Sequence, residues 1–578
     1  MGTYIRLVDI KNSEEKEKGF FDVNNYYIAL DDKFQSIPGQ VYAYWVSEGF
    51  NHIFNQKNKI ADFSYPRQGL HTGDNNTYLR LWYEVDAGEI MFEDSDVWLD
   101  SYKWAKLNKG GSFRKWYGNL DYVILWKNNG QQLKNSKKSV GASNSTFLKN
   151  LIGFTDLTSY IPSFRFYGKG FVYDVSGPSM INDGAFYSDQ ILLGLLNSKV
   201  TEVAMSILSP TLHMNQTALS RISLGEFNDD EKRQLHSWVD ESVQICRDDW
   251  DGFETSWNYC KHPLRGDGMS RLISEKYQEW EKLCDKRREE LKRNEEALNE
   301  YFINLYGLEH ELDSEVKDDD ISARKADLCR EIKSLISYAV GCIMGRYSLK
   351  EDGVIYAGGE WDEERYSADF KPCEYGVMPI TENQFFEEDL GTRVIDFIKV
   401  VYGEDTLADN LKFIASALKP DTYEAPKKVI RDYLFNDFFD NHYQIYHHRP
   451  IYWQLDSGKS GGFRAIVYMH RYNENTLPIV RTEFIQDLRY KYEEEMQRQK
   501  GRLEGASSTA EANAIKKDIA ALDKKIVECA AYDELLNHAT SSIQNYLFDL
   551  DDGVKTNYAK FLSIDGDRNS NILTVVKL

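Results

Sequence analysis

Two long amphipathic runs give this chain elements that a single small core cannot enclose. In the first, between Leu272 and Leu312, apolar residues recur at helical spacing with Glu, Lys and Arg between them. These apolar residues are Tyr277, Trp280, Leu283, Leu291, Leu298, Tyr301 and Leu305. The pattern predicts a long helix, either as a coiled-coil arm or in ordinary helix packing. A second helix is expected from Ile321 to about Met344, after an acidic loop.

The second run predicts a helical hairpin near the end of the sequence. Its turn is expected at Gly505–Ser508, between two apolar stripes. One stripe consists of Phe484, Leu488, Tyr492 and Met496, and the other of Ile515, Ile519, Leu522 and Ile526. Both long runs would suit spacers that hold other parts of the protein apart.

The 578 residues suggest three or four folded regions of mixed type. Short β-branched and aromatic runs such as Tyr78–Val85, Tyr122–Trp126 and Gly170–Val175 predict strands in the first region. The expected fold class is α+β. The expected regions are a β-rich domain at 1–224, a helical spacer at 225–350, a mixed region at 351–440, and a strand pair with the helical hairpin at 441–578.

The charge is unevenly distributed. The chain carries a net charge of −22, which argues against contact with phosphates. Residues 101–175, however, hold 12 Lys or Arg against three Asp, so this segment is at +9 and the other 503 residues are at −31. A basic segment in an acidic chain is what localised phosphate contact requires, although a solvated lysine-rich surface explains the count equally well.

Several classes of site and location are disfavoured. The seven cysteines form no CxxC pair, so neither a zinc knuckle nor a redox motif is supported, and metal ligands are not expected. No run of 18 apolar residues and no signal peptide is seen, so we expect a cytoplasmic protein without a membrane partner. Gly458-Lys459-Ser460 resembles the end of a Walker loop, but no glycine stands five residues before it. We interpret it as a hairpin turn between strand-like runs at Arg449–Trp453 and Phe463–Met469.

Four segments in order carry a resemblance to a known family. Gly69–Trp82 resembles the Gly-x-x-Thr-Gly-x-Asn opening of a TaqI-like target-recognition domain, and Lys109–Asn119 resembles its Lys-Gly-Gly-x-x-Arg-Lys-Trp-Tyr-Gly-Asn segment. A helix of the type Leu192–Lys199 and a Pro210-Thr211-Leu212 stretch follow. The chain is similar to the PglX family, the adenine-specific DNA methyltransferases of BREX phage-defence systems, in the half that follows their catalytic domain.

The resemblance implies sequence-specific recognition of double-stranded DNA for an adenine-N6 methyltransferase. The sequence departs from the family in having no Pro-Pro dipeptide and no glycine-rich S-adenosylmethionine loop. We therefore expect no catalytic residue, no cofactor bound by this chain, and no activity alone. S-adenosylmethionine would bind an N-terminal catalytic domain or a separate catalytic subunit, which is the expected partner. The alternative is a scaffold subunit whose helices and aromatic residues dock other phage-defence proteins.

The expected DNA contacts lie in the first region. Lys109, Arg114 and Lys115 would sit on a glycine-loosened turn and reach phosphates or guanine edges. Arg165 and Lys169 would form a second contact point. Trp116 and Tyr117 beside them could touch sugars, but a buried core position is favoured.

Two further groups have an alternative structural interpretation. Asn215 and Gln216 could bond adenine edges, although such a pair after a helix more often forms a cap or turn. Thr72 and Asn75 could lie near a flipped-out adenine or the adjoining DNA backbone, or could simply form an Asx-type turn.

Overall fold

The computed structural model confirms the α+β class, with 49% of residues in helices and 13% in strands. It describes residues 2–8, 10–29, 37, 43–47, 49–182, 184, 186–209, 211–266, 270–567 and 570–578, so Pro210 of the expected Pro-Thr-Leu stretch lies outside the described residues. The described chain forms two compact units, each built from three stretches. Unit 1 comprises Met1–Leu79, Met91–Trp250 and Cys284–Lys325. Unit 2 comprises Arg80–Ile90, Asp251–Leu283 and Ala326–Leu578.

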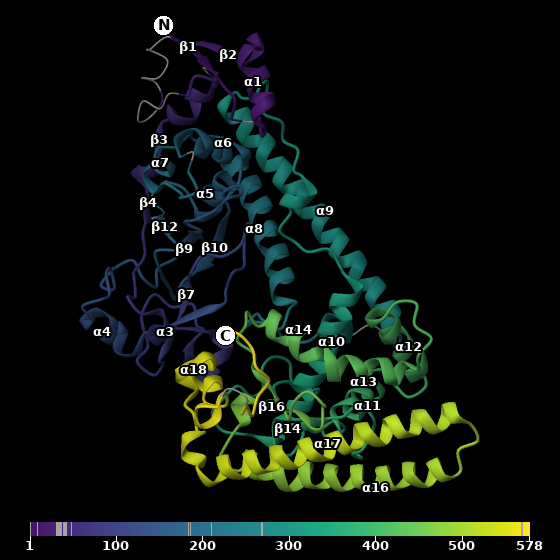
Figure 1. Cartoon of the computed structure of the whole chain (residues 1–578). Helices are drawn as coiled ribbons and strands as arrows, with labels where there is room; N and C mark the ends of the chain where they lie inside the picture. Colours follow the sequence, from purple (N-terminus) through teal and green to yellow (C-terminus); the bar gives the residue numbers. More distant parts are fainter. Residues whose placement is uncertain are drawn as a thin grey trace. The chain divides into compact units, whose positions relative to one another are not determined.

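Unit 1 is where the strands concentrate (Figure 1). Its strands are β1 (Gly2–Ile5), β2 (Tyr26–Ala29), β3 (Asn58–Lys59), β4 (Ser64–Arg67), β7 (Trp104–Asn108), β8 (Tyr122–Leu125), β9 (Leu151–Phe154), β10 (Phe164–Gly168), β11 (Phe171–Tyr173), β12 (Ser179–Asn182) and β13 (Ser223–Leu224). One sheet has the order β10-β9-β12-β4 with antiparallel neighbours. In another, β7 pairs with β11 in parallel and with β8 in antiparallel.

Helices surround these sheets in unit 1. They are α1 (Ser13–Phe21), α3 (Asn75–Tyr78), α4 (Lys127–Asn135), α5 (Asp189–Leu196), α6 (Lys199–Leu208), α7 (Gln216–Leu219), α8 (Asp229–Asp251) and the later part of α9 (Ile273–Tyr306). Leu298 and Phe302 of α9 lie against Gly194 of α5, where a Cβ would stand 3.4 and 3.6 Å from them. The tighter contact at this glycine is with Val239 of α8, whose Cγ2 would stand 3.1 Å from a Cβ, so the glycine in the middle of α5 lets α8 approach closely.

Unit 2 is mainly helical around one small sheet. Its helices are α10 (Leu328–Met344), α11 (Leu390–Tyr402), α12 (Leu407–Leu418), α13 (Pro426–Asn436), α14 (Phe438–Ile445), α15 (Thr476–Ile479), α16 (Gln486–Glu504), α17 (Thr509–Ser541) and α18 (Gly553–Ala559). Its sheet has the order β14-β16-β15, formed by β14 (Val377–Ile380), β15 (Tyr452–Asp456) and β16 (Arg464–Tyr468). Short strands β5 (Leu79–Leu81) and β6 (Ile90–Met91) mark two places where the chain passes between units.

The predicted long helices are present, with shifts at their ends. The first run forms α9, and the hairpin forms α16 and α17, which lie side by side in Figure 1. The helix expected from Ile321 begins only at Leu328, because the Asp327 side chain accepts a hydrogen bond from the Arg330 amide at 2.7 Å and caps it there. The predicted strand at Tyr78–Val85 is wrong beyond Leu81, where β5 ends. The Glu84 carboxylate accepts a hydrogen bond from the Leu81 amide at 2.7 Å and stabilises a 3₁₀ turn at Trp82–Glu84.

The Gly458-Lys459-Ser460 segment is the hairpin turn that the sequence predicted, between β15 and β16. The Glu528 carboxylate of α17 fills this turn. It accepts hydrogen bonds from the Ser460 amide at 2.8 Å, the Gly462 amide at 2.9 Å and the Ser457 hydroxyl at 2.7 Å. The backbone amides that would bind a phosphate in a Walker loop therefore already donate to a carboxylate of the protein.

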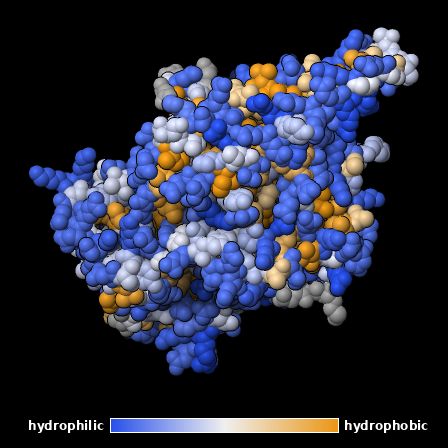
Figure 2. Space-filling model, turned by 90° about the horizontal axis from the view of Figure 1, so that it is seen from below, coloured by the Kyte–Doolittle hydropathy of each residue, from blue (hydrophilic) through white to orange (hydrophobic). Residues whose placement is uncertain are grey.

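Among the described helices, none alone is long and apolar enough to cross a membrane. The pair α5 and α6, bent by 64°, passes that test only when both are counted together, and the apolar residues of both are largely buried. The face of the molecule drawn in Figure 2 is mainly hydrophilic, with apolar residues in small separate groups.

Replacing Glu528 should loosen the β15–β16 turn. Burial alone would raise the pKa of Glu528, but the donors of Gly462, Ser457 and Ser460 outweigh it and hold the pKa below its usual range. We expect Glu528→Ala to lower the free energy of unfolding by about 2 kcal/mol near neutral pH, because three donors lose a charged acceptor. Chemical denaturation measures this change.

The effect should depend on pH. Since the folded-state pKa is lowered, the contribution of Glu528 is fully present above its unfolded pKa of about 4.3 and is lost as the pH falls through the folded value. The control is Glu534→Ala, at an exposed position of α17. Equal stability of the two variants at pH 7 would contradict the assignment.

Candidate nucleic-acid interface

The Lys109–Asn119 segment forms an irregular turn held inside unit 1. Gly110 and Gly111 have φ angles of 73° and 137°, which glycine adopts readily. A Cβ on Gly110 would stand 2.6 Å from the Ser176 carbonyl oxygen, so the close approach here is to the protein's own backbone. Trp116 and Tyr117 are buried, as favoured from the sequence.

Arg114 is buried in a paired position. Its Nη2 donates to Asp249 of α8 at 2.6 Å, and its Nε donates to the Tyr117 carbonyl at 2.8 Å. Arg324 bonds the same carboxylate through its Nε at 3.1 Å. Burial would raise the pKa of Asp249, but Arg324 and Arg114 outweigh it and hold that pKa below its ordinary value. Arg114 therefore joins the turn to α8.

Lys115 and Arg165 are also buried. Lys115 Nζ lies 2.9 Å from Glu295 of α9, whose other carboxylate oxygen accepts from Trp116 Nε1 at 2.7 Å. Arg165 is 0% exposed and donates to the Arg114 carbonyl at 3.1 Å and to the Thr155 hydroxyl at 3.1 Å. Arg114, Lys115 and Arg165 therefore bond groups within unit 1 and have a structural role there.

The other expected cations are more exposed but paired. Lys109 Nζ lies 2.6 Å from Asp174, and Lys169 Nζ lies 3.9 Å from Asp96. Lys149 shares the Asp96 carboxylate at 3.5 Å. Much of the +9 charge counted in the sequence is thus neutralised by carboxylates of unit 1.

Of the remaining expected residues, Thr72, Asn75 and Asn215 form turns or helix caps, and Gln216 does not. The Thr72 hydroxyl donates to Asn75 at 2.6 Å in the turn that begins α3, and Asp74 caps that helix. The Asn215 side chain caps α7 by accepting from the Ala218 amide at 3.0 Å. Gln216, the first residue of α7, directs no side-chain hydrogen bond to a described residue and lines a groove.

We call this hollow the polar groove. Its volume is about 780 Å³. It is lined by Pro66, Arg67, Gln68, Leu133, Lys134, Ser139, Gly141, Ala142, Ser143, Asn144, Ser145, Thr146 and Gln216. The groove joins the end of β4, the C-terminal part of α4, the loop after α4 and the start of α7, all within unit 1.

Local contacts fix the walls of the polar groove. His71 and Val140 exchange backbone hydrogen bonds at 2.8 and 2.9 Å, which tie the loop after α4 to the Thr72 turn. Asn144 accepts from the Thr146 amide at 3.0 Å and donates to the Tyr173 hydroxyl at 3.0 Å. Hydrogen bonds therefore hold the loop after α4 in place at the edge of the groove.

Two exposed cations line the polar groove, and three more lie on α4 and the turn after it. Among the described residues, none of the following makes an ion pair: Arg67, Lys127, Lys134, Lys137 and Lys138. The stretch 122–155 contains no Asp or Glu at all, so no acid close in sequence neutralises the lysines of α4 and the turn after it. The resemblance to the family pointed to Lys109–Asn119 as the DNA-contacting segment. The absence of Asp and Glu from 122–155 was the sequence signal that could have located the lysine surface of α4.

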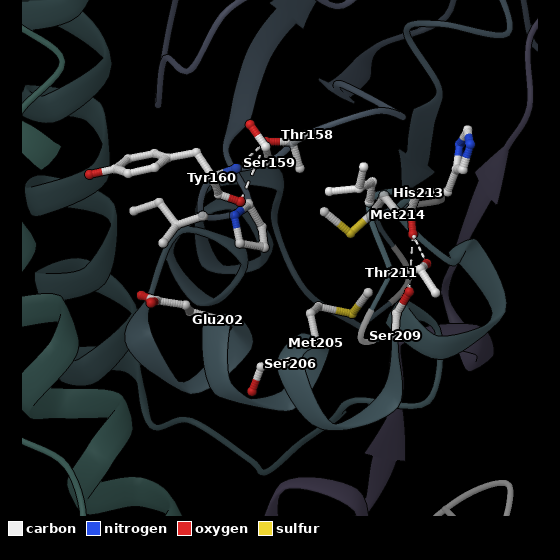
Figure 3. Close-up of a pocket in the computed structure, with 13 residues that line it drawn as sticks. Thr158, Ser159, Tyr160, Glu202, Met205, Ser206, Ser209, Thr211, His213 and Met214 are labelled. Atoms are coloured by element: carbon white, nitrogen blue, oxygen red, sulfur yellow. Dashed lines mark hydrogen bonds between the residues drawn. The ribbon is translucent and has the colours of Figure 1, made fainter. Parts of the chain in front are cut away.

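A second hollow in unit 1 has a different chemistry (Figure 3). It has a volume of about 660 Å³, and its exposed lining is mainly apolar although Ser, Thr, His and Glu side chains also line it. Its apolar residues include Met205 of α6, Met214 and Leu212, which is 58% exposed. Burial raises the pKa of Glu202 at its edge. In the described part of the chain, no group of three His, Cys, Asp or Glu could hold a metal ion.

The chain matches two curated relatives. Adenine-specific methyltransferase PglX of Lacticaseibacillus casei (strain Zhang) is 34% identical over 603 aligned residues, covering 100% of this chain and 49% of the relative. Adenine-specific methyltransferase BrxX of Escherichia coli O9:H4 (strain HS) is 30% identical over 595 residues, covering 96% of this chain and 47% of the relative. The chain is similar to PglX-type adenine-specific methyltransferases.

The PglX-like chain thus spans about half the length of the curated relatives it matches, which confirms the resemblance found in the sequence. No protein-family model matches it. The relatives imply use of S-adenosylmethionine by the full-length proteins.

Removing the Arg114 side chain should destabilise the fold. Asp249 would keep Arg324 but lose its second buried cation, so we expect Arg114→Ala to lower the free energy of unfolding by about 3 kcal/mol. Lys137→Ala, at an exposed and unpaired position, should change it by less than about 0.5 kcal/mol. Thermal or urea unfolding compares the two, and an Arg114→Ala variant as stable as wild type would contradict the buried pairing.

Proposed function

We propose that the chain recognises double-stranded DNA, in a sequence-specific manner, for an adenine-specific methyltransferase of a phage-defence system. The observation that supports this most is the group of exposed, unpaired cations on an otherwise acidic protein. Lys127, Lys134, Lys137 and Lys138 lie within twelve residues on α4 and the turn after it. Cations without carboxylate partners are available to displace counterions from phosphates.

The relatives' names supply the rest of the proposal. Both are adenine-specific methyltransferases, and the chain aligns with about half of each. Because its 578 residues contain neither a Pro-Pro dipeptide nor a glycine-rich cofactor loop, we assign it the recognition role. Methyl transfer from S-adenosylmethionine would then fall to a catalytic domain N-terminal to this half or to a separate catalytic subunit.

The second candidate is a scaffold subunit that docks other phage-defence proteins. The apolar hollow beside Met205 and the exposed Leu212 favours it, since an apolar segment of a partner protein could fill that space. This function would leave the lysines of α4 dispensable, and salt would have little effect on partner binding.

Duplex-DNA binding across a salt series tests the recognition role. We expect wild-type affinity to fall steeply with salt and Lys137→Ala/Lys138→Ala to bind roughly tenfold more weakly. Its log–log salt slope should be about two units shallower, because each lost phosphate contact removes about 0.9 from the slope.

The matched control changes the same charge elsewhere. Lys516→Ala/Lys517→Ala removes an adjacent, exposed lysine pair from α17 and should bind DNA like wild type. A wild-type chain that binds no duplex even at low salt would refute the recognition role and favour the scaffold.

The division of labour can be tested separately. With labelled S-adenosylmethionine and duplex DNA, the chain alone should transfer no methyl group, because it lacks the motifs that hold the cofactor and the target amine. Methylated DNA produced by the purified chain would show that the catalytic assignment is wrong.

A further inference from the structure

The polar groove is lined by neutral hydrogen-bond donors as well as two cations. Arg67 and Lys134 line it together with the side chains of Gln68 and Gln216. Neither glutamine side chain bonds a described residue. Gln68 follows the last residue of β4, and Gln216 opens α7, which packs on β4.

The concave shape of the groove decides what it can hold. A side chain reads base edges by projecting into a groove of the DNA, whereas these amides line a hollow of the protein. A DNA strand presents its outer sugar-phosphate edge to such a hollow. Phosphate oxygens accept from Arg, Lys, Gln and Ser, and these residue types line the groove.

We propose that the polar groove seats the sugar-phosphate backbone of one DNA strand, with Gln68 and Gln216 bonding phosphate oxygens between Arg67 and Lys134. This inference rests on the proposed DNA recognition. It gives Gln216 the role of setting the register of the protein on the duplex, in place of the adenine contact expected from the sequence. Sequence discrimination then belongs to other residues.

A neutral donor leaves a signature that a cation does not. A neutral glutamine that binds a phosphate displaces no counterion from the DNA. Its removal should therefore weaken binding without changing the dependence of affinity on salt. Losing a lysine–phosphate contact weakens binding and also flattens the slope. The two kinds of variant can therefore be separated in one titration series.

The experiment uses the full chain and a random duplex library, followed by salt titrations on the enriched duplex. We expect Gln216→Ala and Gln68→Ala each to bind roughly tenfold more weakly, with the same enriched motif and the same salt slope. Lys134→Ala should lower the slope by about 0.9. Gln131→Ala, at an exposed glutamine of α4 outside the groove, should behave like wild type.

A second measurement places the contact on a phosphate. Neutral methylphosphonates are introduced one at a time into each strand of the enriched duplex. We expect one position to weaken wild type but not Gln216→Ala, because that variant has already lost the bond. Single-stranded DNA of the same sequence serves as the comparison, and it should bind more weakly if the groove takes one strand of a duplex.

The outcomes separate the two proposals. Wild-type binding with an altered motif for Gln216→Ala would show that this residue reads bases and would overturn the inference alone. Unchanged affinity for both glutamine variants, or tighter binding of the single strand, would overturn it as well. Absence of all binding by wild type would refute the recognition function on which the inference rests.

Discussion

The buried carboxylate of Asp249 is the contact on which the organisation of unit 1 depends. It holds Arg114 from the Lys109–Asn119 turn on one side and Arg324, which precedes α10, on the other. A buried carboxylate without cationic partners is energetically costly, so loss of either Arg114 or Arg324 should destabilise the ionised form of Asp249. Two segments distant in sequence are thereby joined at one point of α8.

This pairing changes how a basic segment should be interpreted. A positive charge count shows only that cations are present, whereas contact with phosphate needs cations that the protein has left unneutralised. Within 101–175, carboxylates from α8, α9 and nearby loops take up Arg114, Lys115 and Lys109. The lysines from 127 to 138 lie where the sequence contains no acid, and they remain exposed.

Local patterns predicted local structure well. Helical periodicity located α9 and the α16–α17 hairpin, and the glycine-rich turn between β15 and β16 was identified from its residues. Burial of Arg114 and Lys115 was beyond such reasoning, because their partners Asp249 and Glu295 stand 135 and 180 residues away. The acid-free stretch 122–155 could have indicated the lysine surface, but not the polar groove itself, since β4, α4 and α7 meet only after the chain has folded. The expected contact residues and the four-region division stay predictions.

The interleaving of the two units limits how such genes can exchange parts. Each unit is assembled from three separate stretches, and the chain passes between them five times. A single recombination crossover between related genes would therefore combine strands of unit 1 from one parent with a helix of unit 1 from the other. Asp249 and Arg114 lie on the second stretch of unit 1 and Arg324 lies on the third, so a hybrid with a crossover between these stretches keeps the ion pairs only if both parents place matching charges there. Inherited changes in this region should accumulate mainly by substitution on the exposed loops.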